Sequence, residues 1–87
     1  MTAPEQFGRK IFIARRRAGL TQETLAIFAG LHRTEIGLIE LGKREAKLIT
    51  ILKLLRALGV EPNDLLMGIS PDPKPPKRRS RGDECGR

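Results

Sequence analysis

The chain has 87 residues, with 17 Lys and Arg against 10 Asp and Glu, a formal net charge of +7, and only three aromatic side chains, all Phe. This length excludes a second domain, and no apolar run approaches the roughly 20 residues of a membrane span. The single cysteine, Cys85, excludes an intrachain disulfide and a zinc cluster. The basic charge suits a nucleic-acid partner, and the scarcity of aromatic side chains argues against single strands bound by base stacking, which favours double-stranded DNA.

The first predicted helix runs from about residue 4 to residue 18. Apolar residues recur along it at spacings of three and four, the period of one helix face. They are Phe7, Ile11, Ala14 and Ala18. No alternating strand pattern competes with helix anywhere in the chain, so the fold class is predicted to be all-α.

The second predicted helix follows Thr21, whose side chain can cap it. Leu25, Ala26 and Phe28 are expected to form its inward face. Gly30 is expected to end it, because glycine adopts a positive φ without steric cost and lets the chain reverse.

A third helix is predicted over about residues 32–41. Ile36 and Ile39 lie three apart and are expected to point inward, which leaves the other side of the helix facing outward. Together with the preceding helix, it gives residues 21–42 the pattern of a helix-turn-helix, whose outward face enters the major groove of DNA.

Two further helices are predicted, over residues 48–58 and about 62–66, the first of them stopped by Gly59. The fourth helix carries more apolar residues than one buried face needs. Those expected to serve the core are Leu48, Ile51, Leu54, Leu55 and Leu58.

The remaining apolar residues indicate a second apolar surface. It comprises Ile49, Leu52, Leu66, Met67 and Ile69. We expect a homodimer to bury this surface. The alternative is that the segment after residue 66 folds back and covers these residues within one chain.

The composition changes near residue 70. Residues 70–87 are rich in proline and basic residues and contain almost no large apolar side chains, so they are predicted to form a disordered basic tail after a folded domain at residues 1–69. Non-specific attraction to phosphate and a merely solubilising role are both open for this tail.

Residues 7–66 resemble the phage-repressor and xenobiotic-response-element (Cro/C1-type) family of bacterial regulators. Five positions agree with the family motif in register: Gln22, Ala26, Gly30, Ile36 and Ile39. The flanking agreements are Arg15, Gly19-Leu20, Glu40-Leu41-Gly42-Lys43 and Leu58-Gly59-Val60. The resemblance implies a compact five-helix repressor-type domain, with the third helix as the recognition helix. Restriction–modification controller proteins are among the small members of this family.

The resemblance also implies roles for individual residues. Arg15 and Glu40 are expected to form a partly buried ion pair that is architectural. The residues expected at base edges are Arg33, Thr34, Glu35 and Leu38, although Arg33 could hold a phosphate instead. Those expected at DNA phosphates are Thr21, Gln22, His32, Lys43 and Arg44.

Two positions depart from the family pattern. Gly37 stands where most relatives have a polar side chain, so backbone is expected to come close to DNA or to a neighbouring group. Leu41 stands where relatives often carry a polar or basic residue, so one phosphate contact is expected to be missing.

The expected function is sequence-specific regulation of transcription by a homodimer on an inverted repeat in double-stranded DNA. The expected location is the bacterial cytoplasm, at the nucleoid, because the N-terminus lacks a signal peptide. No enzyme, cofactor or metal site is expected, since His32 is the sole histidine and no glycine-rich phosphate loop is present. The alternatives are an antitoxin or adaptor that mainly binds an unlike protein, and a non-specific nucleoid protein led by the basic tail.

Overall fold

The computed structural model describes residues 1–71, and within them it has five helices and no strand. The helices are α1 (Ala3–Arg17), α2 (Gln22–Ala29), α3 (Arg33–Glu40), α4 (Leu48–Leu58) and α5 (Pro62–Leu66). The predicted all-α, five-helix architecture is therefore confirmed, with boundaries that differ by a residue or two. Apart from its first two positions, the tail predicted at 70–87 lies outside the described residues. None of the helices in residues 1–71 has the length and apolar character needed to cross a membrane.

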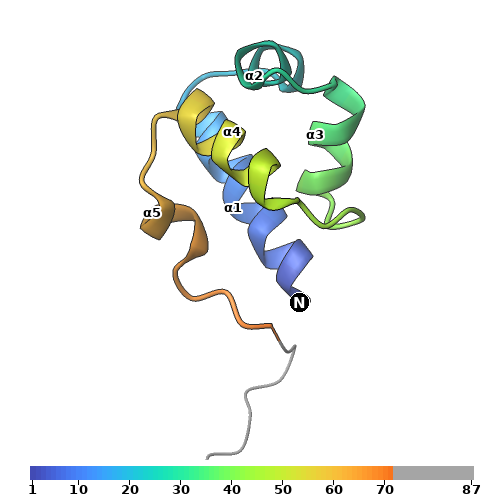
Figure 1. The fold of residues 1–87 in the computed structure, drawn as a ribbon, viewed down its shortest axis with the longest axis vertical. Coiled ribbons are helices and arrows are strands. Elements are labelled where there is room, and N and C mark those ends of the chain that lie inside the picture. The colour runs from blue at the N-terminus through green and yellow to red at the C-terminus, as the bar shows by residue number, and fades with distance from the viewer. Residues whose placement is uncertain (72–87) are drawn as a thin grey trace, which may run out of the picture.

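The helices pack around one centre (Figure 1). Helix α1 packs on α3 and α5, and α2 packs on α3 and α4. Every helix contributes at least one buried apolar side chain to a single core. Its members are Phe7, Ile11, Leu25, Ala26, Ala29, Ile36, Ile39, Leu54, Leu55 and Leu65. This arrangement leaves α2 and α3 at one side of the molecule, joined by a short turn.

Local sequence sets the ends of the first two helices. Thr2 caps α1 in a capping box with Glu5, in which each side chain accepts a hydrogen bond from the other residue's backbone N–H. The hydrogen bond that the Thr2 backbone N–H donates to the Glu5 carboxylate is the largest cause that lowers the pKa of this carboxyl. Thr21 caps α2 as expected, by accepting from the Thr24 N–H at 3.0 Å, and Gly30 ends α2 with φ at +72°.

Three residues expected in the core are not there. Phe28 is 61% exposed and Leu48 is 73% exposed, and Ala18 is also exposed, just beyond the end of α1. Helix α2 has eight residues and buries Leu25, Ala26 and Ala29, so its inward face is rotated away from Phe28. Leu48 is the first residue of α4, and the buried face begins two positions later, at Thr50.

Helices α1 and α3 approach each other closely at Gly8, which the sequence pattern did not predict. Gly8 is buried in the middle of α1, and a methyl group placed there would overlap the carbonyl oxygens of Ile39 and Glu40 at the end of α3. Gly37 in α3 is different, because the atoms nearest to an added methyl group belong to the Gln22 amide, at 3.8 and 3.9 Å. No neighbour in residues 1–71 therefore requires glycine at position 37, and the expected approach to DNA stays a prediction.

These two glycines predict opposite effects of the same substitution. Gly8→Ala should lower the free energy of unfolding by about 1–3 kcal/mol, because the overlap forces α1 and α3 apart. Gly37→Ala should raise it by about 1 kcal/mol, because alanine favours helix and the space allows a methyl group. Urea unfolding of both variants tests this, and a Gly8→Ala protein as stable as the wild type would show that the helices do not approach so closely.

Candidate nucleic-acid interface

A buried ion pair joins the first helix to the end of the third. Arg15 Nε donates to Glu40 Oε2 at 2.6 Å, and Arg15 Nη2 donates to Glu40 Oε1 at 3.1 Å. The two side chains are only 9% and 5% exposed. The remaining guanidinium nitrogen, Nη1, donates to the carbonyl oxygen of Leu20 at 2.9 Å. The pair predicted between these residues is present, with bidentate geometry.

Gln22 extends this ion pair to the second helix. Its Nε2 donates to Glu40 Oε1 at 3.0 Å, so one carboxylate accepts from both α1 and α2. Gln22 is the first residue of α2, and Glu40 is the last residue of α3. The network of Arg15, Gln22 and Glu40 therefore fixes the angle between the two helices of the helix-turn-helix. The bracing role implied for Gln22 has a structural basis, and its phosphate contact stays a prediction.

The outward face of α3 carries the residues expected at base edges. Arg33 and Thr34 are exposed, and Glu35 and Leu38 are half-buried. At about 100° per residue, Thr34 and Leu38 lie opposite the buried Ile36, whereas Glu35 lies at the flank of that face. In the described part of the chain the only ion pair joins Arg15 to Glu40, so the charged groups of α3's outward face do not pair with one another.

The residues expected at phosphates lie at three places. Thr21 is engaged as the cap of α2, where its hydroxyl also pairs with that of Thr24 at 2.8 Å. His32 is the residue before α3 and makes no capping hydrogen bond with its side chain. Lys43 and Arg44 are exposed in the connection between α3 and α4.

A hollow lies where the end of α1 meets the starts of α2 and α3. The residues that line it are Arg15, Arg16, Gly19, Leu20, Thr21, Gln22, Glu23 and Arg33. Arg33 and Gln22 therefore border one space, although they begin different helices. Arg16, which also lines this hollow, was not among the residues expected at DNA.

Most of the predicted second apolar surface is open to solvent. Ile49, Leu52, Leu66 and Met67 are between 42% and 61% exposed, and we call these four residues the α4–α5 surface. Ile69 is half-buried against the core instead, because the chain after α5 turns back along α1, where the Ser70 N–H donates to the Gln6 side-chain oxygen at 3.4 Å. The segment that folds back thus partly buries Ile69 and leaves Ile49, Leu52, Leu66 and Met67 exposed.

Comparison with known proteins places this geometry among helix-turn-helix proteins. The family model described as "Helix-turn-helix" matches residues 11–65. The control protein C.BamHI of Bacillus amyloliquefaciens is 46% identical over 61 residues, which cover 69% of this chain and 75% of that protein.

Two further relatives agree with this match. The SPbeta prophage-derived HTH-type transcriptional regulator YonR of Bacillus subtilis (strain 168) is 39% identical over 62 residues, 71% of this chain and 57% of that protein. The match therefore spans less than two thirds of YonR. The crystal structure of the restriction-modification controller protein C.AhdI from Aeromonas hydrophila superposes with a TM-score of 0.69 at 44% identity, over 71% of this chain and 94% of that chain.

The buried ion pair predicts strong coupling between its two members. Glu40→Leu leaves the Arg15 charge buried without a partner and should lower the free energy of unfolding by about 3–5 kcal/mol, and Arg15→Met should cost a similar amount. The double variant should lose clearly less than the sum, because no uncompensated charge remains. Urea unfolding of the four proteins measures this coupling, and strictly additive losses would contradict it.

Proposed function

Because this chain belongs to the helix-turn-helix family of transcription regulators, we propose that it is a controller-type regulator that binds an inverted repeat in double-stranded DNA as a homodimer. The observation that carries this proposal is the Arg15, Gln22 and Glu40 network, which joins α3 to α1 and α2 and leaves Arg33 and Thr34 of α3 exposed. A recognition helix held in this way can enter the major groove as a fixed unit.

Arg33 is proposed as the main reader of sequence. It is exposed at the first position of α3, and a guanidinium can donate two hydrogen bonds to O6 and N7 of guanine. Thr34 can contact a polar base edge or a thymine methyl group, and Glu35 can accept from N4 of cytosine. Leu38 completes this face with an apolar contact.

Lys43 and Arg44 are proposed to position the protein rather than to read sequence. Both are exposed and lie just after α3, where a charged side chain can reach the DNA backbone. Each phosphate that they neutralise adds about 0.9 to the slope of binding against salt concentration. Thr21, Gln22 and His32 are proposed to add phosphate contacts from the N-terminal ends of α2 and α3.

A second copy of this chain is the proposed occupant of the α4–α5 surface. The four large apolar side chains of this surface are exposed in the single chain, and a symmetric dimer would bury both sets at once. Pairing there would set two α3 helices about 34–36 Å apart, one turn of DNA.

The biological role is proposed by analogy with two relatives. C.BamHI is a control protein and C.AhdI is a restriction-modification controller protein. We propose that this chain likewise controls transcription at an operator in the bacterial cytoplasm, at the nucleoid, and that it has no catalytic activity.

The division between reading and positioning predicts different effects at Arg33 and Lys43. Arg33→Ala should lose roughly 1–3 kcal/mol on the operator and leave binding to random duplex nearly unchanged. Lys43→Ala should weaken binding to every sequence and lower the salt slope by about 0.9. Titrations of both variants over a range of salt concentrations measure these effects. The same uniform loss in both variants would remove Arg33 from the base-reading residues.

The proposed dimer predicts the effect of a charge on the α4–α5 surface. Leu52→Lys should give a folded monomer with wild-type helicity and much weaker operator binding. Each monomer then binds its half-site separately, so the gain in affinity from binding both half-sites as one dimer is lost. Ile27→Lys is the matched control, since Ile27 is 76% exposed on α2, outside this surface, and this variant should stay dimeric. Sedimentation equilibrium tests both, and a wild-type monomer at micromolar concentration would refute the dimer.

A further inference from the structure

The side chain of Phe12 lies under two neighbouring arginines of α1. Its ring centroid is 5.3 Å from Cζ of Arg15 and 5.8 Å from Cζ of Arg16. Both distances are within the roughly 6 Å over which a guanidinium is attracted to an aromatic face. Phe12 is itself 38% exposed and is not part of the apolar core, so its ring lies at the surface of α1.

The two arginines differ in how they are engaged. Each of the three guanidinium nitrogens of Arg15 donates a hydrogen bond, two of them to Glu40 and one to the Leu20 carbonyl oxygen. Arg16 is exposed, and within residues 1–71 its guanidinium makes no ion pair or side-chain hydrogen bond. Arg16 is therefore a cation that the fold orients through a ring but leaves without an anionic partner.

The guanidinium of Arg16 lies beside the hollow at the start of α2. Arg16 of α1, Gln22 of α2 and Arg33 of α3 all line this hollow. Glu23 is the one acidic group among the residues that line it. Arg15 also lines it, but its charge is neutralised by Glu40. The hollow thus has two free guanidinium groups against one carboxylate and suits an anion.

We propose that Arg16 binds a backbone phosphate of the DNA in this hollow, and that Phe12 is a positioning residue that holds its guanidinium there. This proposal rests on the proposed function, which brings Gln22 and Arg33 against DNA. A guanidinium binds phosphate with two parallel hydrogen bonds, and stacking on a ring reduces the entropy lost when it does so. The contact fixes the register of the protein on DNA and carries no sequence information.

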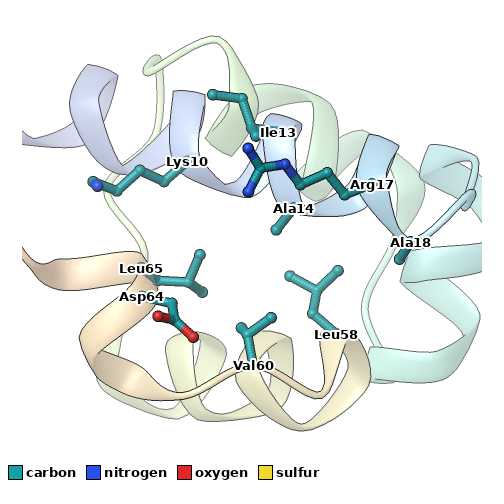
Figure 2. A pocket seen from close by; sticks show the side chains of 9 residues that line it. All are labelled: Lys10, Ile13, Ala14, Arg17, Ala18, Leu58, Val60, Asp64 and Leu65. Carbon is teal, nitrogen blue, oxygen red and sulfur yellow. The ribbon is translucent and has the colours of Figure 1, made fainter.

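The next residue along the helix provides a matched control. Arg17 has the same charge as Arg16 but borders a different space, the groove between α1 and the segment that runs from the end of α4 into α5. Figure 2 shows Arg17 at the rim of this groove, whose apolar lining includes Ala14, Leu58 and Val60. Long-range attraction to DNA is nearly equal for the two arginines, so any difference between them reports a local contact.

The experiment compares Arg16→Ala with Arg17→Ala on an operator selected from random duplexes and on a random-sequence duplex. Arg16→Ala should weaken binding to both duplexes by about tenfold, the loss of one charge-assisted contact. It should also lower the salt slope by about 0.9. Arg17→Ala should weaken binding by no more than about twofold, because its exposed charge is screened.

A double-mutant cycle tests the role of Phe12. Phe12→Leu removes the ring and keeps an apolar side chain, so it should weaken DNA binding in the wild-type background but not in the Arg16→Ala background. Its melting temperature, measured alongside, separates loss of positioning from loss of folding. A Phe12→Leu effect of the same size in both backgrounds would remove Phe12 from this role.

The other outcomes are equally decisive. Equal losses for Arg16→Ala and Arg17→Ala would overturn the Arg16 contact while leaving the proposed function intact. A loss confined to the operator would mean that Arg16 reads bases, which also contradicts the proposal. A wild-type protein that binds no duplex at all would overturn this inference together with the proposed function.

Discussion

The carboxylate of Glu40 connects three helices of this protein through hydrogen bonds. It accepts two hydrogen bonds from Arg15 on α1 and one from Gln22 on α2, and it belongs to α3 itself. A buried charge is costly unless it is paired and its hydrogen bonds are satisfied, so this carboxylate has few alternative positions. The network therefore restricts the orientation of α3 more tightly than apolar contacts, which are non-directional. We therefore expect the network to matter more for the orientation of α3 than for net stability.

The apolar core and the glycine contact support the same arrangement. Ile36 and Ile39 bury one side of α3 completely, which turns the side with Thr34 and Leu38 outward. Gly8 lets α1 pass close to the end of α3, and this closeness brings Arg15 within reach of Glu40. The orientation of α3 thus follows from residues on three separate segments. This orientation supports the proposed role of α3 in DNA binding, because a helix that is already oriented loses less entropy when it binds.

Much of this architecture could be predicted from the sequence, since its signals are local or periodic. Thr21 and Gly30 mark the ends of α2 through capping chemistry and positive φ, and the spacing of Ile36 and Ile39 marks the inward side of α3. The Arg15 and Glu40 pair came from resemblance and not from spacing, because the two residues are 25 positions apart. Phe28 was placed wrongly because the rotation of an eight-residue helix is set by its neighbours. The Gly8 contact depends on the distance between two segments, so no local pattern could predict it. The stacking of Phe12 on Arg15 and Arg16 is different, because it joins residues three and four apart on α1, a spacing that helical periodicity makes neighbours.

The central claim is that two copies of α3, held apart by a dimer, read an inverted repeat in DNA. Selection of bound sequences from a pool of random duplexes tests this claim most directly, because it assumes no operator and no role for any single residue. We expect enrichment of a palindrome whose half-sites are centred about 10 base pairs apart, one turn of the double helix. Enriched sequences without two-fold symmetry, or no enrichment despite binding, would contradict the account.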